Sequence, residues 1–177
     1  MTAPCPLDPA QMEGALRRLA GDVAARLKGE DLVLLGIRSR GLPLAERLAA
    51  LLQAELGRPV PVGALDITLY RDDLTEKVGT PLVRPTEIPF TLKGRTVLLV
   101  DDVLFTGRTI RAALDALLDH GRPKSVRLAV LVDRGGRELP IQADFAALAL
   151  DATEGQRVSV KVKEVDGEDG VFLEPRA

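Results

Sequence analysis

Apolar residues follow two patterns along the chain, and the two patterns alternate. Continuous apolar runs are typical of strands that are buried on both faces of a sheet. Such runs predict strands over 32–37, 60–69, 97–100 and 125–132. Apolar residues three or four positions apart predict helices over about 9–28, after residue 41, and over 110–118. Strands that alternate with helices predict an α/β fold with a central, mostly parallel sheet flanked by helices.

The C-terminal part of the chain shows weaker patterns. Residues 143–150 are mixed, whereas 158–165 alternate apolar with charged residues and predict a half-exposed strand. An acidic turn at 166–170 precedes 171–173, which predicts a return strand and therefore a C-terminal β-hairpin. A length of 177 residues without internal repeats predicts a single domain over 1–177.

Composition and charge narrow the function classes. Apolar residues at 46% and charged residues at 28% are typical of a globular protein. The sequence shows no membrane-spanning run and no signal-peptide pattern, and its one cysteine, Cys5, favours a cytoplasmic location. No Cys/His cluster has metal-ligand spacing, so we expect no metal bound directly by the protein. A net charge of −2 means that any nucleic-acid binding requires a local basic patch.

The most informative stretch joins an acidic pair to the start of a helix. Asp101 and Asp102 follow the strand 97–100, and Thr-Gly-Arg-Thr at 106–109 opens the next helix. A helix N-terminus offers unpaired N–H groups to a phosphate, and Gly107 lets the backbone approach it closely. Carboxylates accept hydrogen bonds from ribose hydroxyls. The stretch therefore predicts a sugar-phosphate site; the alternative is a buried strand that ends in solvated aspartates.

Two more strands run into polar loops. Ser39, Arg40 and Gly41 follow the strand 32–37 and suit a second phosphate group, because they offer N–H donors, a hydroxyl and a guanidinium. The loop 133–140 follows the strand 125–132 in the same way. Since the carboxyl ends of parallel strands meet at one edge of a sheet, we expect these loops to lie near the acidic pair.

A long polar connection at about 70–85 predicts a lid over the site. Arg71, Lys77 and Arg84 could reach an anionic ligand from it. An ordinary surface hairpin is the alternative.

Three arginines, Arg17, Arg18 and Arg26, fan across the polar face of the first predicted helix. From the residues alone, a solvated helix face is the favoured interpretation. His120, the only histidine, falls in the last turn of a helix, where a partly cationic imidazole complements the helix dipole.

These stretches also carry a family resemblance. The run 97–109 resembles the 5-phosphoribosyl-1-diphosphate (PRPP) motif of the type I phosphoribosyltransferases. Together with 36–41, 66–74 and 131–141, it closely resembles the bacterial pyrimidine-operon RNA-binding regulators that are also uracil phosphoribosyltransferases. The resemblance covers roughly residues 9 to 173. Ser39 stands where the family often has Thr, and Gly136 stands where some members carry a basic residue.

The resemblance implies the type I phosphoribosyltransferase fold, with a lid at about 70–85 and a small hood at about 134–177. It implies the reaction uracil + PRPP = UMP + diphosphate, with Mg²⁺ carried by PRPP. It also implies that the protein binds leader RNA of the pyrimidine operon, that UMP or UTP strengthens this binding, and that the protein is a homodimer or a higher homo-oligomer.

Site roles follow from the resemblance and from the chemistry of the loops. Asp101, Asp102 and Arg40 are the expected catalytic residues. The expected substrate-binding residues are Ser39, Arg40, Gly41, Asp101, Asp102, Val103, Leu104, Phe105, Thr106, Gly107, Arg108, Thr109, Val132, Asp133 and Arg134. The last three are the candidates for the base pocket. The expected lid residues are Arg71, Asp72 and Asp73, and the expected RNA-binding residues are Arg17, Arg18, Arg26 and Arg137.

Two alternatives remain open at this point. One is a phosphoribosyltransferase for another base, hypoxanthine–guanine or orotate, with no RNA role. The other is a regulator whose enzymatic activity is vestigial.

Overall fold

A parallel sheet forms the centre of the molecule, and all its strands run in one direction. The computed structural model describes residues 5–76 and 79–176. The sheet has five strands in the order β2-β1-β3-β4-β5, and every neighbouring pair is parallel. The strands are β1 (Leu32–Ile37), β2 (Val62–Leu65), β3 (Thr96–Leu104), β4 (Ser125–Asp133) and β5 (Phe145–Ala149). All carboxyl ends therefore lie along one edge of the sheet.

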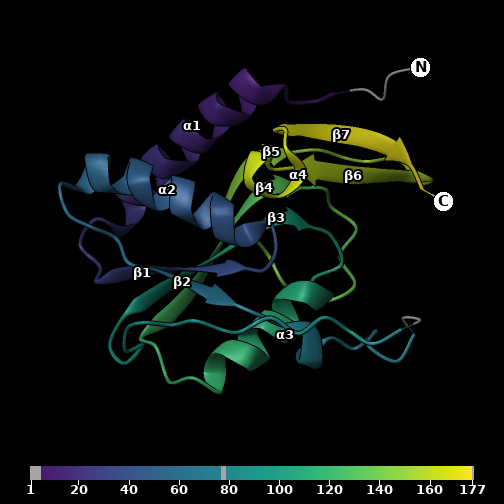
Figure 1. Cartoon of the computed structure of the whole chain (residues 1–177). Coiled ribbons are helices and arrows are strands. Elements are labelled where there is room, and N and C mark those ends of the chain that lie inside the picture. The colour runs from purple at the N-terminus through teal and green to yellow at the C-terminus, as the bar shows by residue number, and fades with distance from the viewer. Residues whose placement is uncertain (1–4, 77–78, 177) are drawn as a thin grey trace.

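Helices cover both faces of this sheet (Figure 1). The helices α1 (Pro9–Leu27) and α2 (Gly41–Leu56) pack on one face, and α3 (Arg108–Leu118) packs on the other. Every residue of β1 is buried, and its alternate side chains enter two different cores. Leu32 and Leu34 face the core with α1 and α2, whereas Val33 and Leu35 face the core with α3. Burial on both faces explains why the strand reads as a continuous apolar run.

The first helix forms where its apolar stripe predicts it. Asp8 caps it by accepting a hydrogen bond from the N–H of Gln11 at 2.8 Å, and the side chain of Gln11 accepts the N–H of Asp8 at 2.9 Å. This reciprocal capping box, with Pro9 in the first turn, defines the start of the helix.

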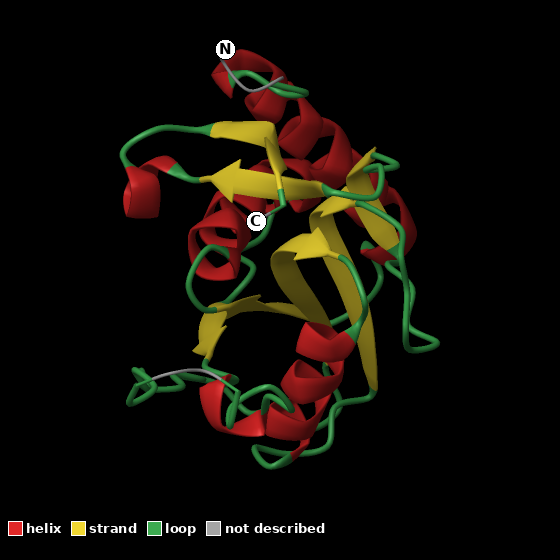
Figure 2. Ribbon diagram, turned by 90° about the vertical axis from the view of Figure 1, so that its right-hand side faces the viewer, coloured by secondary structure: helices red, strands yellow, loops and turns green. Residues whose placement is uncertain are grey.

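The C-terminal hairpin forms a second, smaller sheet beside the first (Figure 2). It contains β6 (Gln156–Lys161) and β7 (Gly170–Pro175), which are antiparallel and are joined through the short helix α4 (Lys163–Asp166). β5 lies within the range 134–177 expected for the hood, but it pairs with β4 in the main sheet.

Three predicted strands have different limits in the structure. The strand predicted over 60–69 is wrong beyond Leu65, because the Asp66 carboxylate accepts the N–H of Thr68 at 2.7 Å and turns the chain into a 3-10 helix, Thr68–Tyr70. The strand predicted to stop at residue 100 continues to Leu104, because its backbone keeps pairing with β4. The strand predicted over 158–165 is wrong beyond Lys161, where the chain enters α4.

Candidate functional site

Both carboxylates of the acidic pair lie within β3 rather than after it. Asp101 is only 6% exposed, and its Oδ1 accepts the N–H of Asp102 at 2.9 Å. The Oδ1 of Asp102 accepts the N–H of Val103 at 2.8 Å. Burial raises the pKa of Asp101 well above its usual range, and the charge of Asp102 adds to this effect. Burial also raises the pKa of Asp102, although the nearby charge of Arg40 opposes the change.

A cavity of about 250 Å³ opens in front of this pair. Both carboxylates line it, together with Ser39 and Arg40 of the loop after β1. That loop reaches the pair only because residue 41 is a glycine. A Cβ at Gly41 would stand 2.4 Å from the carbonyl oxygen of Val100, a distance that side chains do not tolerate. The sequence prediction that the two loops meet at one sheet edge is confirmed.

A second cavity of about 230 Å³ lies at the N-terminus of α3 and is lined by residues 103–110 and 71–73. Gly107 is the N-cap of this helix and has a φ of +93°, which favours glycine. The N–H of Arg108 donates to the hydroxyl of Thr106 at 3.3 Å. The two cavities share Arg71, Val103 and Thr109 as lining residues, so they adjoin each other. Together they form one site, which has the acidic pair at one end and the N-terminus of α3, a feature suited to a phosphate, at the other.

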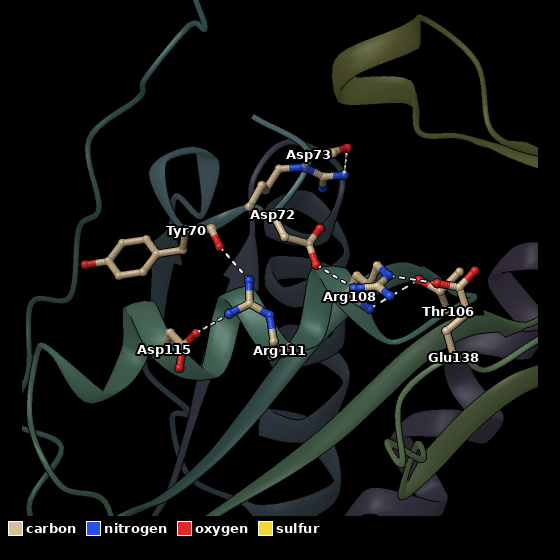
Figure 3. A network of polar contacts seen from close by, with 9 residues as sticks. Tyr70, Asp72, Asp73, Thr106, Arg108, Arg111, Asp115 and Glu138 are labelled. Carbon is tan, nitrogen blue, oxygen red and sulfur yellow. Dashed lines mark hydrogen bonds and ion pairs between the residues drawn. The ribbon is translucent and has the colours of Figure 1, made fainter. Parts of the chain in front are cut away.

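Arginine side chains connect the start of the expected lid to this second cavity through hydrogen bonds (Figure 3). Arg108 donates to Asp72 at 2.7 Å and to Glu138 at 2.7 Å, and so bridges two loops. Arg71 holds Asp73 with two hydrogen bonds at 2.8 and 2.9 Å, and its Nη1 reaches the hydroxyl of Thr109 at 3.3 Å.

The far end of the expected lid reaches the loop after β1. Nη1 of Arg84 donates to the hydroxyl of Ser39 at 3.2 Å. Lys77, which the sequence also places in the lid, lies outside the described residues.

The loop after β4 lies directly against the loop after β3. The guanidinium of Arg134 stacks on the ring of Phe105, with 3.9 Å between the guanidinium carbon and the ring centroid. The N–H groups of Glu138 and Leu139 both donate to the carbonyl of Thr106, at 2.9 and 3.1 Å. Val132 is fully buried at the end of β4.

The carboxylate of Asp133 is held inside this loop. Burial works to raise its pKa, but hydrogen bonds from Arg137 at 2.6 Å and from the N–H of Gly135 at 3.0 Å outweigh burial and lower the pKa. The expected base-pocket residues thus adjoin the expected phosphate loop. No pattern in the sequence indicates that Arg134 stacks on Phe105.

Comparison with known proteins decides the family. The model of the phosphoribosyl transferase domain matches residues 7–164, which is most of the chain. The chain belongs to the phosphoribosyltransferase family.

Among curated relatives, this phosphoribosyltransferase is 57% identical to the "Bifunctional protein PyrR" of Thermus aquaticus, over 92% of this chain and 91% of that protein. It is 53% identical to the protein of the same name in Deinococcus radiodurans, over 98% of this chain and 96% of that protein. Both the family and the fold expected from the sequence are confirmed.

Solved structures support the fold. The hypoxanthine phosphoribosyltransferase of Trypanosoma cruzi matches with a TM-score of 0.72 at 19% identity, over 97% of both chains. The hypoxanthine-guanine enzyme of Leishmania tarentolae, solved with GMP, matches with a TM-score of 0.72 at 18% identity, over 100% of this chain and 99% of that chain. At such low identity these matches show the shared fold alone.

The four arginines expected to bind RNA differ in how free they are. Arg17, Arg18 and Arg26 are exposed on α1, as the sequence predicts. Arg17 pairs with Glu13 on the same helix. Arg26 donates to the carbonyl of Asp144 and lies over the ring of Phe145, so it is partly engaged with the main sheet.

Arg137 is different, because its side chain is only 19% exposed. It donates to Asp133, to the carbonyl of Phe105 at 3.0 Å and to the carbonyl of Ile141 at 2.8 Å. These bonds hold the loop after β4 in shape. The guanidinium of Arg137, which the sequence places among the expected RNA-binding residues, is therefore engaged within the protein.

Other expectations concern features outside the site. His120 is exposed in the turn that follows α3, and its N–H donates to the carbonyl of Leu117. Within residues 5–76 and 79–176, no group of three or more His, Cys, Asp or Glu side chains could hold a metal ion. No helix in the same part of the chain is long and apolar enough to cross a membrane.

Proposed function

We propose that the protein is a pyrimidine-biosynthesis regulator that also catalyses uracil + PRPP = UMP + diphosphate. The observation that carries the proposal is the pair of adjoining cavities that share Arg71, Val103 and Thr109. One end offers carboxylates to ribose hydroxyls, and the other offers the N–H groups of a helix start to the 5′-phosphate. The relatives named bifunctional support the second, regulatory role.

The reaction breaks the bond between ribose C1 and diphosphate and forms a bond from C1 to a ring nitrogen of uracil. The sugar passes through an oxocarbenium-like state, which needs positioning and negative charge nearby more than it needs a protein nucleophile. Asp101 and Asp102 would supply that charge and hold the ribose hydroxyls. Ser39, Arg40 and Gly41 would hold the leaving diphosphate.

Mg²⁺ would enter the site together with PRPP, as part of the substrate. Mg²⁺ keeps several of its waters and takes few carboxylate contacts. The half-buried carboxylate of Asp102, which lines the same cavity as Ser39 and Arg40, suits contact with such an ion through one of its waters.

The base would enter beside the loop after β4, where Val132, Asp133 and Arg134 are the proposed pocket residues. The lid, with Arg71, Asp72 and Asp73 at its start, would close over the bound substrates and exclude water. We propose that the protein works in the cytoplasm, because its single cysteine is a free, exposed thiol that suits a reducing compartment.

RNA binding would use the exposed arginines of α1, Arg17, Arg18 and Arg26. A net charge of −2 makes such a local patch necessary. Arg137 would act by shaping the neighbouring loop. In a homodimer or a higher homo-oligomer, two copies of the patch would combine their fields.

Two experiments test the proposal. Steady-state assays with uracil, hypoxanthine, guanine and orotate should show efficient turnover for uracil alone. A gel shift with the organism's own pyrimidine leader RNA should show binding that UMP strengthens. Preference for a purine or for orotate would refute the substrate assignment. RNA binding without turnover of uracil would mean that the protein is a regulator whose enzymatic activity is vestigial.

A further inference from the structure

One edge of the Arg40 guanidinium is occupied by a carboxylate from a distant part of the chain. Nε of Arg40 donates to Oδ2 of Asp166 at 3.0 Å, and Nη2 donates to Oδ1 at 2.8 Å. Asp166 belongs to α4 in the C-terminal hairpin, 126 positions along the sequence. Its side chain is only 17% exposed, and its Oδ2 also accepts the N–H of Val162 at 2.8 Å. The carboxylate is therefore itself held in place.

This arrangement leaves the other edge of the guanidinium available. Arginine has five N–H donors in a rigid plane, and a bidentate pair on one edge fixes the direction of the opposite edge. Within the described residues, Nη1 of Arg40 donates no hydrogen bond. Arg40 lines the cavity that contains the acidic pair. We propose that Asp166 is a positioning residue, which orients Arg40 so that its free edge binds the diphosphate of PRPP.

The inference rests on the proposed function and deepens it, since it assigns a role in substrate binding to the C-terminal hairpin. Nothing in the sequence around Asp166 indicates this role beyond an acidic turn. The pair joins the loop after β1 to a hairpin that is otherwise outside the main sheet. Diphosphate affinity would then depend on the contact between Arg40 and Asp166.

A neighbouring ion pair provides a matched control. Arg47 of α2 binds Glu164 and Asp169, which lie on the same turn of the hairpin as Asp166. Arg47 lies outside both cavities of the site and lines a groove between α1 and α2. Glu164→Gln weakens the attachment of the hairpin to α2 and leaves the contact between Arg40 and Asp166 in place.

The experiment compares full-length wild type with Asp166→Asn and Glu164→Gln. We expect Asp166→Asn to raise the KM for PRPP and the inhibition constant of diphosphate about tenfold each, equal to about 1.4 kcal/mol. The KM for uracil should change less than about twofold. Glu164→Gln should leave all three constants near wild type. In an Arg40→Ala background, Asp166→Asn should add no further loss, because its effect runs through Arg40.

Several outcomes would overturn the inference. An unchanged KM for PRPP in Asp166→Asn would overturn it. An equal loss of PRPP affinity in Glu164→Gln would also overturn it, because the turn would then have only a structural role. Should Asp166→Asn fold poorly, Asp166→Glu keeps the charge and should bind PRPP nearly as tightly as wild type. Calorimetry with Mg·PRPP alone measures the binding step without uracil. A wild type that binds PRPP but does not turn over uracil would refute the proposed function and leave this test intact.

Discussion

Replacing Asp101 with Asn should make the ligand-free protein more stable and the enzyme slower. The amide has nearly the same shape, and its oxygen can still accept the N–H of Asp102, as the carboxylate does at 2.9 Å. What the substitution removes is a charge that is buried beside a second carboxylate. Burial and that neighbour raise the pKa of Asp101, so the ionised form is the unfavourable one in the folded state. A buried charge of this kind is retained at the expense of stability when it serves a ligand.

Burial makes the larger contribution to this gain, and the repulsion within the pair adds to it. For two unit charges about 4 Å apart, an effective dielectric constant of about 20 gives roughly 4 kcal/mol. The positive charges of two arginines offset part of this repulsion energy. The charge of Arg71 acts to lower the pKa of Asp101, and the charge of Arg40 acts to lower the pKa of Asp102. We therefore expect a net gain on the order of 1 kcal/mol, or a rise of about 2–4 °C in Tm for a chain of this size.

The pH dependence has a definite sign. A group whose pKa is raised in the folded state contributes stability below its unfolded pKa and loses it as the pH rises through the folded value. Wild type should therefore lose stability relative to Asp101→Asn as the pH rises from about 4, the unfolded pKa of Asp, through the raised pKa of Asp101 in the folded state. Scanning calorimetry of both proteins across this range measures the difference in Tm, which should grow with pH.

Activity should move in the opposite direction. Asp101→Asn, and Asp102→Asn in parallel, should lower kcat/KM for uracil and PRPP at least tenfold, or about 1.4 kcal/mol of transition-state stabilisation. Wild-type kinetics in both variants would show that the ribose does not bind at the pair. A Tm below wild type at pH 8 for Asp101→Asn would refute the electrostatic reasoning.

Three other results are expected. Amide hydrogen exchange should be faster in the described lid residues 71–76 than in the sheet, and PRPP should slow it; protection in the free protein would argue against a lid. Arg18→Glu should weaken leader-RNA binding strongly and leave turnover near normal. Arg137→Glu should weaken RNA binding and lower the Tm as well, because the guanidinium of Arg137 forms hydrogen bonds that hold the loop after β4. Gly41→Ala should lower the Tm and raise the KM for PRPP several-fold, because the added Cβ would stand 2.4 Å from the carbonyl oxygen of Val100. Normal kinetics in this variant would contradict the close approach of the loop after β1 to β3.

The main sheet was predictable because local patterns determine it. Strands buried on both faces need apolar residues throughout, and β1 matches its apolar run 32–37 from end to end. Helix α1 matches its stripe and has its own caps. The two ligand loops were predictable for a related reason, since a parallel sheet brings the carboxyl ends of its strands to one edge.

Features that depend on distant partners were not predictable from the sequence. The continuation of β3 through the acidic pair depends on β4, which supplies the backbone partners as far as Leu104. Polar residues on a pairing strand look the same in sequence as polar residues in a loop. The contact between Arg40 and Asp166 joins two residues that are 126 positions apart, and no periodicity in the sequence indicates such a contact.

The hydrogen bonds of Arg137 join the loop after β4 to the loop after β3. Its guanidinium bonds Asp133 of the proposed base pocket and the carbonyl of Phe105 in the loop that leads to the phosphate site. Glu138, the next residue, binds Arg108 of the phosphate loop. A ligand that moves the phosphate loop must therefore also move the loop after β4, because these bonds join the two. We therefore expect substitutions at Arg137 to perturb the proposed base pocket as well as the proposed RNA surface, and those at Arg18 on α1 to act on the proposed RNA surface alone.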